Sequence, residues 1–241
     1  MSMSNPYAVS SDIRVAALAD STERADFIRR TYLHLGGAIA AFVLLEAVFM
    51  NTVGPVLLGL LGGNRWAPLL FIGAFMGVSW LARSWAQSDA SPQLQYAGLA
   101  LYVVAEAAIF APLLLIADSM SEPGESIALM AGLITGVVFL GLTAITLMSR
   151  ADFSWMGRLL WIAGLGALAT VLCGAIFGFS LGLWFSVAMV VLAAGYILYD
   201  TSNVLHHYRT NQHVAASLAL FASVALLLWY VVRVLMALRD E

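Results

Sequence analysis

Three carboxylic acids, Glu46, Glu106 and Asp200, lie inside long apolar stretches of the 241-residue sequence. A charge inside a membrane span costs at least a few kcal/mol unless a partner, water or a proton relieves it. The apolar run that starts at Leu181 continues beyond Asp200 to Leu205, which predicts that this acid lies within a membrane helix. Acids in such places hold or transfer protons and cations, so we predict a polar or protonatable path at these residues.

Simpler interpretations remain open for each acid. All three can be separately satisfied polar residues, and Glu46, far along its apolar run, can reach the outer interface. If the helix around Asp200 ends at Tyr199 instead, residues 200–203 (Asp-Thr-Ser-Asn) form the polar end of that helix and a cap for the next segment of the chain. The acid then lies among lipid headgroups and needs no partner.

The histidines are candidate metal ligands, but their spacing does not favour a metal site. His206 and His207 are adjacent, so they point to different faces of any helix, and no cysteine or acid stands at ligand spacing around them. We expect no metal ion. A hydrated inner loop accounts for His206, His207 and His213, and these groups, with His34, can still sense pH near neutrality.

Enzyme classes find little support in the sequence. All 11 basic residues are arginine, so no lysine is present to form a Schiff base. The sequence has no His-Glu-x-x-His, no Gly-x-Ser-x-Gly and no glycine-rich phosphate loop. An aspartyl intramembrane protease needs two facing carboxylates, and the last apolar segment offers no acid before Asp240. We therefore expect neither an enzyme nor a cofactor.

The composition indicates a protein that crosses a membrane several times. The chain is 62% hydrophobic and only 10% charged, with a mean hydropathy of +0.91, whereas soluble domains are about 25% charged. The expected partner of so apolar a surface is a lipid bilayer, with no nucleic acid. The single cysteine, Cys173, lies in an apolar run and allows no internal disulfide.

Seven apolar runs approach the roughly 20 residues that a membrane helix needs. They are Thr31–Met50, Ala67–Ala86, Tyr96–Ala117, Ile127–Met148, Gly157–Phe179, Leu181–Leu205 and Val214–Leu238. The predicted organisation is a polar arm at residues 1–28 and an all-α, seven-helix transmembrane domain at residues 29–241. The connectors are short, and Gly54, Pro55, Gly62 and Gly63 mark the first of them. Glycine pairs inside the runs, such as Gly36-Gly37 and the Gly164-Leu165-Gly166 segment, predict close helix packing.

The distribution of arginine predicts the orientation. With the N-terminus inside, eight arginines fall in inner segments and three in outer ones: Arg14, Arg24, Arg29, Arg30, Arg83, Arg150, Arg158 and Arg209 against Arg65, Arg233 and Arg239. This bias favours an inner N-terminus and an outer C-terminus. At about 1.5 Å per residue, Glu46 then lies toward the outer face, Glu106 near the middle and Asp200 about two turns from the inner end of its helix.

Two motifs carry a resemblance to a known family. The first is GYILYDTSNVLH at residues 195–206, with Tyr199, Asp200, Thr201 and Asn203 at its centre. The second is RADFSWMG at residues 150–157, which contains Asp152, Ser154 and Gly157, and a third, weaker match is Arg30-Thr31-Tyr32. Together they resemble the Bax inhibitor family, the transmembrane Bax-inhibitor-motif proteins, and within it the bacterial YccA-like branch.

The resemblance implies a seven-helix bundle whose last helix is central, and a pH-sensitive calcium leak. In that family two aspartates, on the sixth and seventh helices, share a proton and hold a pore shut. Asp200 matches the first, while Ser223 stands where the second would be. A serine can hydrogen-bond to Asp200 but cannot supply like-charge repulsion. Arg83 is the nearest match to a basic residue that partners the acid in some members.

The resemblance implies two functions, and both stay open at this point. One is a cation leak pathway for calcium or protons, gated around Asp200. The other is modulation of the membrane AAA+ protease FtsH, a role that is associated with the YccA-like branch and its N-terminal arm. This branch tends to have serine at the position of the second aspartate. Both imply a multipass protein of the bacterial inner membrane. A purely structural membrane protein is the remaining alternative.

Overall fold

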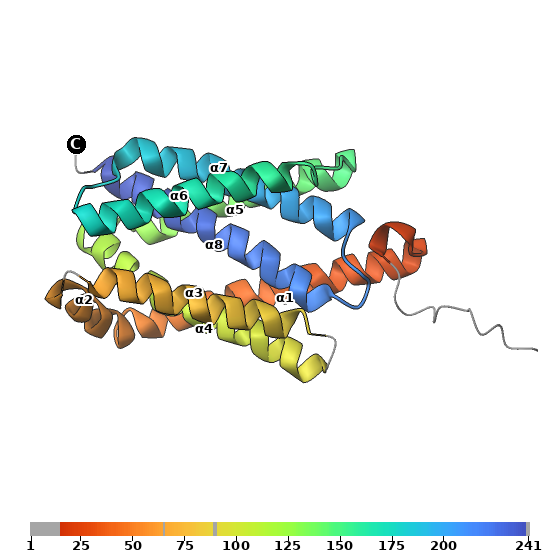
Figure 1. Cartoon of the computed structure of the whole chain (residues 1–241), viewed down its shortest axis with the longest axis horizontal. Helices are drawn as coiled ribbons and strands as arrows, with labels where there is room; N and C mark the ends of the chain where they lie inside the picture. Colours follow the sequence, from red (N-terminus) through yellow and green to blue (C-terminus); the bar gives the residue numbers. More distant parts are fainter. Residues whose placement is uncertain (1–14, 65, 89–90, 240–241) are drawn as a thin grey trace, which may run out of the picture.

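The computed structural model describes residues 15–64, 66–88 and 91–239, so Arg14, Arg65, Asp240 and the first half of the predicted arm lie outside the described residues. The described chain is helical almost throughout (Figure 1). A short 3-10 helix, η1 (Ala16–Leu18), is followed by α1 (Ser21–Phe49), α2 (Val53–Gly63), α3 (Ala67–Ala86), α4 (Pro92–Ser119), α5 (Ile127–Ser149), α6 (Met156–Phe177), α7 (Gly182–His206) and α8 (His213–Ala237).

Seven of the described helices, α1 and α3 to α8, are long and apolar enough to cross a membrane. The predicted all-α, seven-span fold is therefore confirmed. The largest difference at a helix end is in α1, which begins at Ser21 rather than near Thr31. Asp20 and Glu23 make its first turn polar, so the helix extends beyond its apolar part, which is all that a hydropathy pattern detects. The domain boundary predicted at residue 28 lies within this continuous helix.

The connector between the first two spans is not a plain loop, which corrects the prediction made from its glycines and proline. It forms the 11-residue helix α2. Pro55 is tolerated because it occupies the first turn, where backbone N–H groups have no partner inside the helix. A Cβ added to Gly54 would lie 2.7 Å from Leu115 Cδ1, so this glycine lets α2 pack closely on α4 rather than breaking the chain.

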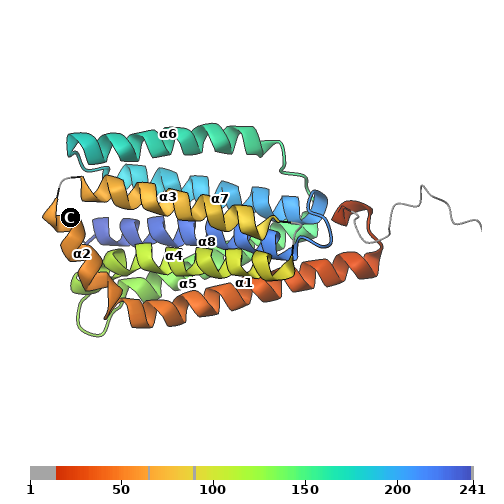
Figure 2. The ribbon, with the colours of Figure 1, turned by 60° about the horizontal axis from the view of Figure 1, so that its bottom comes forward.

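Helix α8 is the centre of the bundle. It packs against α1, α3, α4, α5 and α7, and side chains on all its faces are buried, including Leu220, Phe221 and Leu227. Such a helix has neighbours on every side, whereas a span at the edge of a bundle leaves one face to lipid. Figure 2 shows the opposite situation for α6, which lies at the edge of the bundle beside α7. The last span is therefore central, as the resemblance implies.

Helix α7 continues without a break to His206, and this places Asp200 inside a helix. The alternative in which the helix ends at Tyr199 is therefore wrong. Asp200 stands six residues before the end of α7, a distance of about 9 Å along the axis. The end itself is closed by the Asn203 carbonyl, which accepts hydrogen bonds from the backbone N–H groups of His207 and Tyr208.

The described N-terminal residues fold back onto the end of α7. The Ala16 N–H donates to the Tyr208 carbonyl over 2.9 Å, and Val15 forms an isolated antiparallel bridge with Arg209. Arg24, on α1, donates to the carbonyls of Ala16 and Ala17 at 2.7 and 2.5 Å. The segment before α1 is thus attached to the helix that carries Asp200.

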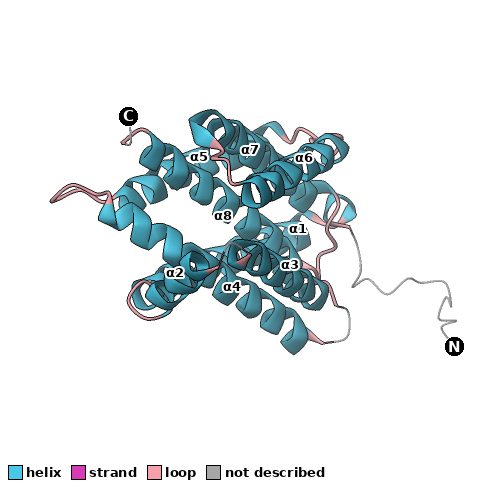
Figure 3. Cartoon of the chain, turned by 60° about the vertical axis from the view of Figure 1, so that its left-hand side comes forward, coloured by secondary structure: helices cyan, strands magenta, loops and turns pink. Residues whose placement is uncertain are grey.

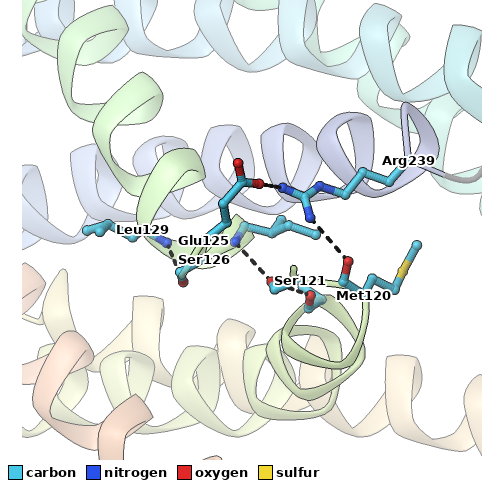
Figure 4. A network of polar contacts seen from close by, with 8 residues as sticks. Met120, Ser121, Glu125, Ser126, Leu129 and Arg239 are labelled. Carbon is cyan, nitrogen blue, oxygen red and sulfur yellow. Dashed lines mark hydrogen bonds and ion pairs between the residues drawn. The ribbon is translucent and has the colours of Figure 1, made fainter. Parts of the chain in front are cut away.

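At the opposite end of the bundle, the C-terminal residues are tied to the α4–α5 loop (Figure 4). The Arg239 guanidinium forms an ion pair with Glu125 and donates to the Met120 carbonyl over 3.2 Å. The loop is also closed internally, because the Ser121 hydroxyl accepts a hydrogen bond from the Ile127 N–H. The start of α1 and the end of α8 lie at opposite ends of the molecule (Figure 3), while which end faces the cell interior stays a prediction.

Candidate functional site

A cavity of about 570 Å³ lies between α3, α6, α7 and α8, and Asp200 is in its wall. Arg83, Tyr196 and Ser223 also line it, together with apolar side chains of α6 and α8. Asp200 is only partly buried because its side chain faces this space. The structure thus brings together three residues that the sequence analysis selected: Asp200, Ser223 and Arg83.

Asp200 contacts the central helix directly. The Ser223 hydroxyl, which is buried on α8, donates a hydrogen bond to the Asp200 Oδ2 atom. The serine thus occupies the position facing the acid, and it supplies a donor where a second aspartate would supply a like charge. The contact between these residues is observed, while their part in gating stays a prediction.

Arg83 is an arginine that acts on two of the three acids. It lies in the last turn of α3, is exposed at the cavity, and interacts electrostatically with both Asp200 and Glu106. Its guanidinium donates to the Tyr102 hydroxyl over 3.4 Å and stands 5.5 Å from the centre of that ring. Tyr102 was not selected from the sequence, because nothing in its neighbourhood distinguishes it from a core aromatic residue.

Glu106 and Glu46 lie deeper in the bundle. Glu106 is buried one helical turn after Tyr102 on α4, and the Tyr102 hydroxyl is its hydrogen-bonding neighbour. Glu46 is buried on α1 near Glu106, and neither of its carboxyl oxygens has a hydrogen-bond partner among the described residues. An unpaired carboxylate is very costly in such a place, so this group needs a proton or a bound cation. The structure does not support the interpretation in which Glu46 reaches the outer interface.

Aromatic rings close the core beside these acids. Phe42 and Phe110 meet edge to face with centroids 5.1 Å apart, and Phe42 and Phe221 are 5.9 Å apart. Phe42 lies one turn before Glu46, and Phe110 lies one turn after Glu106. Glu46 and Glu106 therefore lie next to a packed aromatic cluster in the core.

The second sequence motif packs onto the end of α7. The Ser202 hydroxyl accepts a hydrogen bond from the Phe153 N–H over 2.9 Å and lies 3.4 Å from Asp152 Oδ1 and 3.5 Å from His206 Nδ1. This set is not a catalytic triad, because the acid contacts the serine rather than the histidine and Ser202 is fully buried. It fixes the α5–α6 loop to α7. The Ser154 N–H, 2.9 Å from the exposed Asp152, lowers the pKa of that carboxyl.

Two glycines of α6 set its distance from α7. A Cβ added to Gly157 would lie 2.8 Å from the Tyr199 ring, and one added to Gly164 would lie 2.7 Å from the Tyr196 hydroxyl. That hydroxyl donates to the Leu160 carbonyl over 2.8 Å. The motif residues Gly157 and Tyr199 are thus packing partners. The prediction of close packing is right for Gly164 but wrong for Gly36 and Gly37, whose added Cβ atoms would meet nothing within 4 Å.

The remaining motif residues have structural surroundings. Thr201 is buried, and its hydroxyl lies near that of Tyr32 without a hydrogen-bond partner among the described residues. Asn203 ends α7 through its backbone carbonyl. Among the described residues, no three His, Cys, Asp or Glu side chains gather closely enough to hold a metal ion.

Comparison with known proteins places the chain in a family. Residues 24–240 match the family described as "Inhibitor of apoptosis-promoting Bax1". The chain belongs to this family. It is 35% identical to protein lifeguard 4 of Mus musculus over 48% of the chain and 49% of the mouse protein.

The chain is also 36% identical to Bax inhibitor 1 of Schizosaccharomyces pombe, over 39% of the chain and 36% of the yeast protein. An uncharacterized membrane protein of Vibrio cholerae is 30% identical over 38% of the chain and 41% of that protein. The chain thus spans half or less of the length of these curated relatives. No solved structure gives a significant match.

Proposed function

We propose that this Bax1-family multipass membrane protein provides a cation leak pathway, for calcium or protons, that is gated around Asp200. The observation that carries the proposal is the cavity in whose wall the Asp200 carboxyl is held against α8 by Ser223, with Arg83 in the same wall. Gain or loss of a proton at Asp200 changes the charge of this wall and the strength of the bond to Ser223. Such a change is a means of opening and closing the path in response to pH.

The deeper acids extend the proposed path. Glu106 lies beyond Arg83, and Glu46 lies beyond Glu106 with no hydrogen-bond partner among the described residues. A cation that leaves the cavity therefore meets further carboxyl groups rather than an uninterrupted apolar core. In the closed form Arg83 opposes cations at the cavity, and the rings of Phe42, Phe110 and Phe221 obstruct the core.

The proposal is tested by reconstituting the full chain into liposomes that contain calcium and pH indicators. We expect a leak whose rate changes between about pH 6 and 8 in the wild type, and a rate without that change in Asp200→Asn, because an amide does not titrate. Ser223→Ala removes the donor that holds Asp200, worth about 1 kcal/mol, and should speed the leak roughly fivefold.

Asp118→Asn is the matched control, because Asp118 is an exposed acid at the far end of α4 and is not part of the cavity. It should leave both the rate and its pH dependence as in the wild type. Equal flux in wild type and Asp200→Asn at every pH tested would contradict the leak proposal.

A second candidate function is regulation of the membrane AAA+ protease FtsH, without transport, in the bacterial inner membrane. The specific observation in its favour is that Ala16, in the segment before α1, donates a hydrogen bond to Tyr208, just after the end of α7. A partner that binds residues 1–14 would therefore pull directly on this helix. Assignment to the YccA-like branch, where this role is expected, stays part of the proposal.

Deleting residues 1–14 tests this second function while leaving the attached segment in place. We expect altered turnover of FtsH substrates and an unchanged leak in liposomes. An Arg24→Gln variant, which loses the bonds to Ala16 and Ala17, should mimic the deletion only if attachment to α7 transmits the effect. Unchanged substrate turnover after the deletion rejects this candidate.

A further inference from the structure

A polar pocket of about 500 Å³ lies where α4 and α8 begin, at the same end of the bundle as the start of α1. Its described lining contains Arg30 and Arg209, the polar groups of Ser91 and Asn211, and His213. No acidic side chain is among these described lining residues. The helices α4 and α8 both begin at this pocket, and the partial positive charge of their first turns adds to that of the arginines.

An apolar groove of about 570 Å³ runs between α1 and α4. Gly37, Ala38 and Ala41 line one side, and Leu99 and Val103 line the other. A Cβ added to Gly37 would meet nothing within 4 Å. Gly37 therefore does not bring the two helices together; it leaves a hollow on the apolar surface.

The pocket and the groove adjoin each other. Tyr96 lines both of them, His34 lines the groove, and His213 lines the pocket. The rings of His34 and His213 lie 4.9 Å apart, and the Tyr96 hydroxyl is 3.3 Å from His213 Nε2. The three rings lie where the polar pocket meets the apolar groove.

We propose that one phospholipid occupies these two cavities, with its phosphate in the pocket against Arg30 and one acyl chain in the groove along Gly37. The pocket has the charge and donors for a phosphate, and an arginine has five N–H donors to share between acceptors. Arg30 forms a 2.7 Å ion pair with Asp26, and Glu23 accepts a hydrogen bond from Thr210. The ion pair with Asp26 involves one terminal nitrogen of Arg30, so other N–H groups of this guanidinium can still donate to a phosphate.

The position of the site selects a lipid over a soluble phosphate compound. The groove lies on the apolar parts of α1 and α4, both of which are membrane spans, and the pocket lies at their polar end. A soluble anion would fill the pocket but leave the groove to ordinary surrounding lipid. This inference goes beyond the proposed leak and does not depend on it.

The test is native mass spectrometry of the delipidated full chain, titrated in detergent with phosphatidylglycerol. We expect one lipid to be retained more tightly than the rest. Gly37→Leu, which fills the groove, should weaken that binding at least tenfold, and Ala41→Phe, one turn further along, should do the same. Gly36→Leu is the matched control, because Gly36 is equally open but does not line the groove.

The headgroup is tested separately. Arg30→Gln should weaken retention, while Arg29→Gln, at a neighbouring exposed arginine outside the pocket, should not. Inorganic phosphate and glycerol phosphate, added as competitors, should displace the lipid only weakly, because they cannot fill the groove. Equal retention by Gly37→Leu, Ala41→Phe and wild type overturns the proposal and leaves annular lipid only. Full competition by free phosphate overturns it in favour of a soluble anion.

Discussion

The three intramembrane acids differ in their immediate partners although they share a residue class and an apolar setting. Asp200 receives a hydrogen bond from Ser223 and faces a cavity, whereas Glu46 is buried and its carboxyl oxygens lack partners among the described residues. Glu106 lies between them, beside Tyr102 and within range of Arg83. The cost of holding a charge is therefore different at each acid, and only Asp200 has both a donor and open space next to it.

Asp152, in the loop outside the membrane spans, gives a prediction about pH. The Ser154 N–H holds the pKa of Asp152 below its usual value of about 3.9. A lowered folded-state pKa adds stability that is present above the unfolded pKa and is lost as pH falls through the folded value. We expect the thermal midpoint of the wild type in detergent to fall below about pH 4, and that of Asp152→Asn to fall less.

The amide of Asp152→Asn keeps an acceptor for the Ser154 N–H but does not titrate, so the loop contact itself survives. Asp118→Asn removes an exposed acid elsewhere in the chain and should follow the wild-type curve. An identical acid response of Asp152→Asn and the wild type would contradict this account. Because Asp152 is exposed, the difference should be small.

Glycines set the distances between neighbouring helices. Gly98 on α4 faces the backbone of α3, and a Cβ there would lie 2.5 Å from the Ala82 carbonyl oxygen and 2.6 Å from the Ala86 nitrogen. Backbone atoms of a packed helix cannot move aside cheaply. The α3–α4 contact, which holds Arg83 beside Tyr102, therefore depends on this glycine.

Gly98→Ala should destabilise the protein by about 1–3 kcal/mol, since the added methyl must separate α3 from α4. The measurement is the thermal midpoint in detergent. Gly132→Ala on α5 is its control, because a Cβ there would meet nothing within 4 Å. By helix propensity alone that control should be neutral or stabilising by up to about 1 kcal/mol. A midpoint for Gly98→Ala equal to that of the control would show that the two helices can separate freely.

The outer helix α6 gives a prediction that concerns the cavity. Gly164→Leu should push away Tyr196, break its bond to the Leu160 carbonyl, and reduce the cavity that Gly164 and Tyr196 both line. We expect a leak at least several-fold slower in liposomes, with modest loss of stability. Gly166→Leu, two residues along and facing open space, should leak like the wild type. Equal leak rates of the two variants would indicate that the path does not pass this cavity.

The whole molecule is arranged around α8, with α6 the least covered of the spans. A central helix that contacts five neighbours has no freedom to move without disturbing all of them, whereas α6 packs chiefly on α7. Opening of the Asp200 cavity is therefore expected at α6 rather than at α8. The N-terminal segment and the C-terminal Arg239 are attached at opposite ends of the bundle and restrain α7 and the α4–α5 loop respectively.

The orientation of the whole chain is tested by cysteine labelling. In a Cys173→Ser background, Glu122→Cys places a thiol in the exposed α4–α5 loop, and Asn211→Cys places one in the exposed α7–α8 loop. With eight arginines in the inner segments, we expect a membrane-impermeant maleimide to label position 122 in intact cells and position 211 only after lysis. The reverse pattern would invert the predicted topology.

Hydropathy and a few motifs were sufficient to predict the number of long apolar helices and the place of Asp200 inside one of them, because a bilayer imposes the length and polarity of each span on the sequence. The same pattern could not predict α2, because the glycines of a short apolar helix resemble those of a connector. It could not predict the first ten residues of α1 either, because a polar extension of a helix has the composition of a connector. The sequence also could not predict the distances at which helices pack. Gly37 and Gly98 look alike in the sequence, although only Gly98 lies against a neighbouring helix.

Tertiary structure alone decided which residues meet. The contact of Ser223 with Asp200, the position of Arg83 between two acids, and the junction of His34, Tyr96 and His213 all join residues from different helices. Each of these contacts depends on the relative rotation and depth of two spans. Those quantities are set by side-chain packing over the entire bundle, whereas the sequence pattern of one span reports only its length and apolar faces.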